Sequence, residues 1–231
     1  MRNPLWIPAL FVASACPFAQ QFDHQVGAIP GTPRWTEGVE AADVDNDGDL
    51  DLFFADGDGF TTPGTKRQNK LVMNMLEVSA GTFADESVAR LGLHSSNAKM
   101  AITGDIQDDG FIDAMFCNAF ATDLPFLYVN DSTTPGFFTF EGVARGFTTA
   151  YSSGSGQFGD IDNDGDLDVV IGNAGQPNAV YFNGGDGLTF VAVPFGEEGD
   201  VGPPQLGPHL EPVAIDQRLE QRIPQSRSGR R

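Results

Sequence analysis

The sequence predicts an all-β fold of short antiparallel strands, arranged as about three blades of four strands each in a partial or open β-propeller. Three observations predict it. A nine-residue acidic loop occurs at residues 43–51, 105–113 and 160–168, the copies begin 62 and 55 residues apart, and short apolar runs bounded by turn residues surround each loop. A unit repeated at such a period is expected to bury its core by stacking on its neighbours.

The repeat extends well beyond the acidic loop. A phenylalanine precedes each loop by 21 or 22 residues, and an asparagine ends an apolar run after each loop; these residues are Phe22, Phe83 and Phe138, then Asn74, Asn130 and Asn183. We therefore divide residues 20–198 into three repeats at about 22–82, 83–137 and 138–198. The segment 66–78 also fits one amphipathic helical turn, but its phase with the other repeats favours a strand.

The third repeat shows the expected strands most clearly. Residues 156–159 lead into the loop and residues 167–172 lead out of it, so the acidic loop becomes a hairpin turn. Residues 178–183 are expected to form a third strand. The Gly-Gly-Asp-Gly turn at 184–187 then leads to a fourth strand at 188–193.

The spacing within the loops indicates a ligand set for a hard cation. Carboxylates at loop positions 1, 3, 5 and 9 concentrate negative charge, position 7 is expected to offer a backbone carbonyl, and glycine at position 6 permits the sharp turn. Oxygen-only ligation of this kind suits Ca²⁺. The predicted ligands are Asp43, Asp45, Asp47, Asp49 and Asp51 in the first loop, and Asp160, Asp162, Asp164, Asp166 and Asp168 in the third. An EF-hand is excluded, because it requires glutamate at position 12, where the chain has Phe54, Phe116 and Ile171.

The middle loop has a weaker ligand set. Gln107 replaces the aspartate at position 3, so that Asp105, Asp109 and Asp113 remain as charged ligands and Phe111 offers its backbone carbonyl. We expect weaker Ca²⁺ binding at this loop, and the sequence leaves open that it binds none. The chain is thus predicted to hold two Ca²⁺ ions and a weaker third.

The pattern Asp-x-Asp-x-Asp-Gly-x-x-Asp, preceded in the third repeat by Phe158-Gly159, resembles the FG-GAP or VCBS-type repeats of the integrin α-subunit β-propeller. Over about residues 20–195, the chain is also similar to bacterial secreted relatives of cartilage acidic protein. The resemblance implies Ca²⁺ in the strand-to-strand loops of blades, and an extracellular role in adhesion or scaffolding. Gln107 and the number of repeats depart from the family pattern, because propellers typically close with four to eight blades. An open arc of three blades would expose sheet edges and apolar faces and so favour self-association.

The two ends of the chain differ in character from the repeats. Residues 1–15 have the pattern of an export signal, with Arg2, an apolar stretch too short to span a bilayer, and a terminal Ala-Ser-Ala. Cys16 follows directly, so a lipid anchor at Cys16 is an alternative, as is a buried first strand or helix. Residues 199–231 are rich in proline, glutamine and arginine and are expected to be disordered. This abrupt change suggests the hypothesis that the chain is the amino-terminal part of a longer ancestor.

Net charge and the absence of known catalytic motifs limit the classes of function that the sequence supports. The formal net charge of −19 argues against nucleic acid as a partner. No nucleophile elbow, phosphate loop or zinc-spaced histidine pair occurs, so no enzymatic activity is predicted. Cys117, within an apolar run, is expected to be an inert buried thiol. We expect a secreted or cell-surface module without a transmembrane span, which binds a protein or glycan; the alternative is an accessory part of a secreted hydrolase or lyase whose catalytic domain lies outside this chain.

Overall fold

We describe residues 28–31, 34–76 and 78–195 from a computed structural model. The described residues form strands and a single five-residue helix, which confirms the all-β prediction. No helix among them is long and apolar enough to cross a membrane. The predicted export signal at 1–15, Cys16 and the predicted disordered tail at 199–231 lie outside the described residues.

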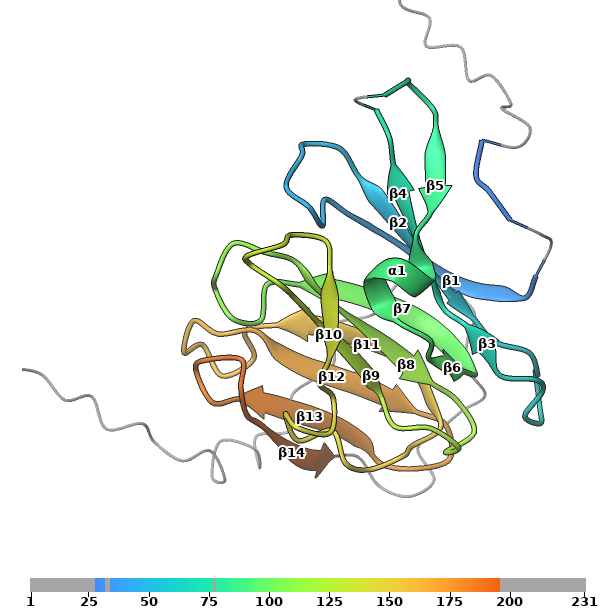
Figure 1. The fold of residues 1–231 in the computed structure, drawn as a ribbon. Helices are drawn as coiled ribbons and strands as arrows, with labels where there is room; N and C mark the ends of the chain where they lie inside the picture. The colour runs from blue at the N-terminus through green and yellow to red at the C-terminus, as the bar shows by residue number, and fades with distance from the viewer. Residues whose placement is uncertain (1–27, 32–33, 77, 196–231) are drawn as a thin grey trace, which may run out of the picture.

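Three four-stranded sheets, each an antiparallel meander, make up most of the structure (Figure 1). Sheet 1 contains β1 (Thr36–Ala42), β2 (Asp51–Asp56), β4 (Lys70–Asn74) and β5 (Phe83–Asp85). Sheet 2 contains β7 (Ala98–Gly104), β8 (Asp113–Asn118), β9 (Phe126–Asn130) and β10 (Phe138–Phe140). Sheet 3 contains β11 (Ser153–Gly159), β12 (Asp168–Asn173), β13 (Asn178–Asn183) and β14 (Phe190–Phe195). A small fourth sheet pairs β3 (Arg67–Gln68) with β6 (Ser95–Ser96).

The sheets are out of phase with the repeats predicted from the sequence. Phe83 and Phe138 were placed at the starts of the second and third repeats, but the structure puts them in β5 and β10, the last strands of sheets 1 and 2. Phe190 likewise begins β14, the last strand of sheet 3. The difference arises because a sequence period defines the length of a unit, but not which strand of the unit comes first.

Most of the local elements follow the sequence, but the helix and the short strand β6 do not. Residues 70–74 form the strand β4, which agrees with the prediction of a strand rather than a helical turn within 66–78. The one helix, α1 (Ser87–Leu91), was not predicted. Five residues make little more than one turn, which is too short to produce a helical pattern of apolar residues in the sequence.

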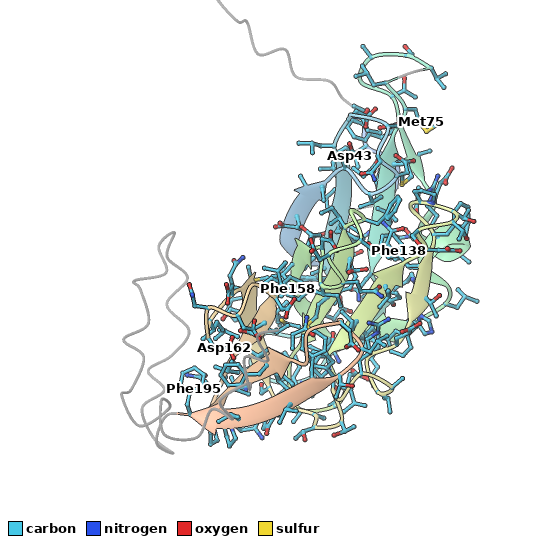
Figure 2. The ribbon with its side chains drawn as sticks, turned by 90° about the vertical axis from the view of Figure 1, so that its left-hand side faces the viewer. Asp43, Met75, Phe138, Phe158, Asp162 and Phe195 are labelled. Atoms are coloured by element: carbon cyan, nitrogen blue, oxygen red, sulfur yellow. The ribbon has the colours of Figure 1, made fainter. Side chains whose placement is uncertain are left out.

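The three sheets stack face to face in chain order, and an apolar core fills each gap between them (Figure 2). Between sheets 1 and 2, the rings of Phe53 and Phe116 meet edge to face with centroids 6.0 Å apart. Between sheets 2 and 3, Met115, Val169 and Tyr181 are buried together. Stacking therefore buries both faces of sheet 2, but only one face each of sheets 1 and 3.

Two glycines in first strands lie in close contact with the neighbouring sheet. A Cβ atom on Gly38 of β1 would lie 2.8 Å from the carbonyl oxygen of Lys99 in β7, and one on Gly156 of β11 would lie 2.7 Å from the sulfur of Cys117. Larger side chains at these glycines would force the sheets apart. Cys117 is fully buried, which confirms the prediction of a buried thiol. Burial also raises the pKa of this thiol to about 12, which disfavours the reactive thiolate.

Candidate metal centres

The three acidic loops connect the first and second strands of their sheets and share one backbone conformation. The residue at position 4 and the glycine at position 6 both have positive φ in every copy. The values are 59°, 53° and 61° for Asn46, Asp108 and Asn163, and 95°, 86° and 104° for Gly48, Gly110 and Gly165. Glycine adopts this conformation without the strain that a side chain adds, and asparagine and aspartate tolerate it better than most residues.

Carboxylates at positions 1 and 5 hold the loop in shape. In the first loop, the Oδ1 and Oδ2 atoms of Asp43 accept hydrogen bonds from the amides of Asp47 and Gly48, at 3.2 and 3.0 Å. Asp47 in turn accepts one from the amide of Asp49 at 3.0 Å. The corresponding bonds recur in the other two loops. These bonds turn the aspartate oxygens toward the inside of the loop.

The position 9 aspartates connect each loop to the third strand of its sheet. Asp113 is buried and accepts hydrogen bonds from the amide of Ile106 at 3.0 Å and from the amide of Asn130 at 2.8 Å. Asp51 and Asp168 accept the same pair of bonds. Each carboxylate oxygen has a further lone pair, so a position 9 aspartate that makes these bonds still has a lone pair for a metal ion.

The first and third loops bring three carboxylates close together. One oxygen from each of Asp43, Asp45 and Asp51 lies within 4.8 Å of the others, as do oxygens from Asp160, Asp162 and Asp168. The position 5 residues Asp47 and Asp164 and the position 7 residues Asp49 and Asp166 are not part of these clusters. Only the first and third loops show such a cluster within the part of the chain that the structure describes.

The position 3 carboxylates supply a second observation that favours a cation site. Atom Oδ1 of Asp45 and atom Oδ1 of Asp162 are buried and have no hydrogen-bond partner among the described residues. Leaving a carboxylate oxygen desolvated and unpaired is unfavourable, so native structures normally provide a donor or a metal ion. Both orphaned oxygens are on residues of the clusters, and the donor set fits a hard divalent cation such as Ca²⁺.

The middle loop keeps the conformation but lacks the cluster. Asp105 accepts hydrogen bonds from the amides of Asp109 and Gly110, at 3.1 and 2.7 Å, as its counterparts do. Gln107 packs against the turn before β14, because a Cβ atom on Gly187 would lie 2.7 Å from its Cγ atom. The loop is therefore shaped as a binding loop, but its position 3 side chain is neutral.

Burial dominates the electrostatics of the loops. It raises the pKa of Asp51 and of Asp113 to about 7, even though the backbone amides that donate to them act in the opposite direction. Burial, reinforced by the neighbouring position 5 carboxylate, also raises the pKa of Asp45 and of Asp162. The metal-free loops thus resist full ionisation, and a bound cation would relieve this.

We expect the metal-free protein to lose stability as the pH rises from about 4 to about 7. The folded-state pKa values of Asp51 and Asp113 lie above their unfolded values, so the unfolded chain releases these protons first and ionisation favours unfolding. Urea unfolding in calcium-free buffer across this range measures the effect. With saturating Ca²⁺ the part of the decline that comes from Asp51 should disappear. A free energy of unfolding that rises with pH in calcium-free buffer would contradict the expectation.

Two buried asparagines link the first and middle acidic loops to the sheets that follow them in the chain. The Nδ2 atom of Asn130 donates to the carbonyl of Val44 in the first loop at 2.7 Å and to that of Ile112 at 3.0 Å. Asn183 donates to the carbonyl of Ile106 in the middle loop at 2.9 Å and to that of Leu167 at 3.2 Å. The sequence showed these asparagines in phase with the repeat, but their partners lie far away along the chain. Their role was therefore not predicted.

Two arginines in the connections between sheets contact the acidic loops or the turns that pack on them. Arg145 is buried, donates to Glu141 at 2.7 Å and also donates to the carbonyl of Gly187. Arg90 donates to Glu86 at 2.5 Å, and one of its terminal nitrogens lies 3.8 Å from the Oδ2 atom of Asp45. Arg90 therefore offsets part of the negative charge of the first loop, although its distance from Asp45 is long for an ion pair.

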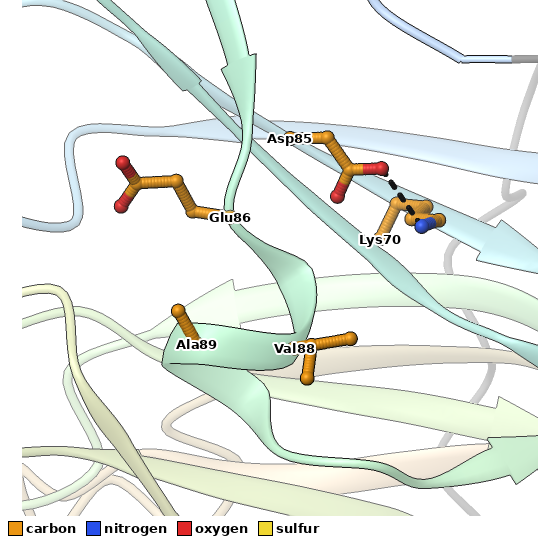
Figure 3. A pocket seen from close by; sticks show the side chains of 5 residues that line it. All are labelled: Lys70, Asp85, Glu86, Val88 and Ala89. Carbon is orange, nitrogen blue, oxygen red and sulfur yellow. Dashed lines mark hydrogen bonds and ion pairs between the residues drawn. The ribbon is translucent and has the colours of Figure 1, made fainter.

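A surface hollow of about 580 Å³ is lined by residues that do not belong to the acidic loops (Figure 3). It is lined by Lys70, Asp85, Glu86, Val88 and Ala89. Lys70 and Asp85 pair with each other at 2.8 Å, and Glu86 pairs with Arg90. The charged groups of the hollow are already engaged, so the acidic loops remain the stronger candidate site.

Comparison with known proteins gives no independent assignment. No family model matches the chain, and no curated protein matches it significantly. The functional interpretation therefore rests on the chemistry of the loops and on how they are joined to the sheets.

Proposed function

We propose that this protein is an exported, calcium-stabilised repeat protein of the β-propeller type, which serves as an adhesion, interaction or scaffolding module. The observation that carries the proposal is the coincidence of two carboxylate clusters with two orphaned buried oxygens, on Asp45 and Asp162. A structural calcium ion accounts for both. The proposed partners of the protein are proteins or glycans at the cell surface, and we propose that the protein has no catalytic activity of its own.

The arrangement of the sheets supports the propeller assignment. Each meander has its acidic loop between its first and second strands, and the first strands β1, β7 and β11 pack side by side. Blades of a propeller are four-stranded sheets arranged around a central channel. Because the loops share one edge of the stack, the atom Nδ2 of Asn46 reaches the carbonyl of Gly110 in the next loop at 3.1 Å. Bound calcium would thus stiffen one rim of the array.

Asp162→Asn is expected to weaken calcium binding at the third loop at least about tenfold, because it removes one of three clustered charges. Calorimetric titration of Ca²⁺ into the full chain should show the loss of one of two stronger sites. The control is Asp131→Asn, which makes the same charge change at an exposed turn of sheet 2. Equal binding curves for Asp162→Asn and wild type would contradict the assignment.

Gln107→Asp is expected to convert the middle loop into a third strong site. The loop already has the backbone conformation and hydrogen bonds of the other two, and the shorter side chain fits where Gln107 meets Gly187. We expect calcium binding at this loop to tighten by about tenfold or more, since charge count tunes affinity. The control is Gln157→Asp on the exposed part of β11. An unchanged number of strong sites would show that position 3 does not limit the middle loop.

The module role is tested by offering the calcium-loaded chain an array of polysaccharides and extracellular matrix proteins. We expect binding without turnover. Turnover that disappears in Asp162→Asn, and persists in Asp131→Asn, would contradict a purely binding role and assign catalysis to the loop carboxylates. Absence of both binding and turnover across the array would contradict the proposed partner class while leaving the calcium sites to their own titrations.

A further inference from the structure

The same contact joins sheet 2 to sheet 1 and sheet 3 to sheet 2. Each contact consists of the asparagine at the end of the third strand and the glycine in the turn that follows, and we call this pair the clasp. Asn130 and Gly136 form the clasp that holds the first loop, and Asn183 and Gly187 form the clasp that holds the middle loop. Neither glycine has room for a Cβ atom. A Cβ atom on Gly187 would lie 2.6 Å from the carbonyl oxygen of Ile106, and one on Gly136 would clash with the guanidinium of Arg90.

Sheet 1 has the asparagine and the turn glycine of a clasp but no loop for them to hold, and sheet 3 has a loop without a clasp. The side-chain amide of Asn74, at the end of β4, has no hydrogen-bond partner among the described residues. A Cβ atom on Gly81 would meet nothing within 4 Å. At the other end of the stack, the carbonyl of Ile161 in the third loop accepts no hydrogen bond within the described part of the chain, unlike those of Val44 and Ile106.

The outer faces of sheets 1 and 3 expose apolar residues at positions that are buried where two sheets meet inside the stack. Val39 and Phe54 pair across β1 and β2 on the outer face of sheet 1, and Val39 is 55% exposed. The residues at the same repeat positions in sheet 2, Ala101 and Phe116, are buried against sheet 1. On the outer face of sheet 3, Val191 pairs with Phe182 and is 60% exposed. Each outer face thus offers apolar surface that the inner sheets bury against a neighbour. The outer face of sheet 1 also carries the ion pair between Lys70 and Asp85.

We propose that a second copy of this chain completes both contacts, with the outer face of sheet 1 in one copy packed on the outer face of sheet 3 in the other. Asn74 of one copy then donates to the carbonyl of Ile161 in its partner, repeating the contact already made twice within each chain. Two copies related by a twofold axis make two such interfaces. The result is a closed ring of six sheets, within the four to eight blades typical of propellers.

The oligomeric state of the full chain tests this directly. Sedimentation velocity at increasing concentration should show a limiting mass twice that of the chain. Val39→Asp and Val191→Asp, placed on the two outer faces, should each shift the protein to a monomer. Val143→Asp is the control, because Val143 is 56% exposed but lies on the connection between sheets 2 and 3. Asn74→Ala should weaken dimerisation by about tenfold to a hundredfold, since one hydrogen bond is lost at each of two interfaces.

Mixing the two single variants distinguishes the proposed contact, between the sheet 1 face of one copy and the sheet 3 face of the other, from a contact between two identical faces. Val39→Asp retains an intact sheet 3 face and Val191→Asp an intact sheet 1 face, so the mixture should form a heterodimer through one undamaged interface. Near-ultraviolet circular dichroism confirms that each variant is folded. A chain that stays monomeric at all concentrations, assembly that continues beyond two copies, or a dimer that survives Val39→Asp would each overturn the proposal. A monomer would indicate that the chain's own termini or another protein cover these faces.

Discussion

Removal of Ca²⁺ is expected to lower the melting temperature of this protein by about 10–20 °C. At free Ca²⁺ about 100-fold above the dissociation constant, each occupied site adds about 2.7 kcal/mol, so two sites add about 5 kcal/mol. For a protein of this size, 1 kcal/mol shifts the melting temperature by about 2–4 °C. Thermal unfolding followed by circular dichroism, with saturating Ca²⁺ and with excess EGTA, measures the shift.

The variants separate bound calcium from general effects of salt. Asp45→Asn combined with Asp162→Asn removes the position 3 charge from both predicted sites, and its melting temperature should not respond to EGTA. Asp131→Asn should respond as the wild type does. A melting temperature that is unchanged when EGTA is added to the wild type would contradict a structural role for calcium.

Asn130→Ala is expected to destabilise the protein by about 3–5 kcal/mol. The side chain donates to the carbonyls of Val44 and Ile112 and accepts from the amide of Gly136, and all three bonds are lost together. Each buried group left without a partner costs about 1–3 kcal/mol. Urea unfolding in saturating Ca²⁺, at a concentration where the chain is monomeric, measures the loss.

Asn74→Ala is the matched control. Asn74 ends the third strand of sheet 1 as Asn130 ends that of sheet 2, but its side-chain amide contacts no acceptor among the described residues. Its replacement should change the free energy of unfolding of the monomer by no more than about 0.5 kcal/mol. Equal losses for the two variants would contradict the view that the clasp, rather than the asparagine itself, provides the stability.

Calcium binding and sheet stacking depend on the same segments. Val44 and Ile106, at loop position 2, accept the hydrogen bonds of the clasps, and in the first loop the flanking residues Asp43 and Asp45 belong to the carboxylate cluster. The position 9 aspartates bond the amides of both position 2 and the asparagine of the same sheet. A cation that fixes the loop therefore also fixes the carbonyl on which the next sheet docks.

Much of this architecture was predictable, because it is encoded locally. The hairpin loops, the strand nature of residues 70–74 and the buried thiol of Cys117 all follow from spacing, phase or the apolar character of short segments. The position 1, 3 and 9 aspartates of the first and third loops were predicted as ligands, and they form the clusters. Whether they hold Ca²⁺ stays a prediction for the titrations.

What the sequence did not predict depends on contacts between distant segments. The bond from Asn130 to Val44 spans 86 residues, and nothing near either residue in the sequence signals it. The double role of Asp113, which holds two backbone amides, becomes visible only when β9 lies beside β8. The short helix α1 forms in a connection whose sequence carries no helical period.

A crystal structure grown with Ca²⁺, with anomalous scattering data collected near the calcium edge, tests the central claim most directly. We predict one peak between Asp43, Asp45 and Asp51 and one between Asp160, Asp162 and Asp168, with a weaker peak or none at the middle loop. Loops one and three without anomalous density at saturating Ca²⁺, or with Arg90 bonded to Asp45 in place of a metal ion, would contradict it.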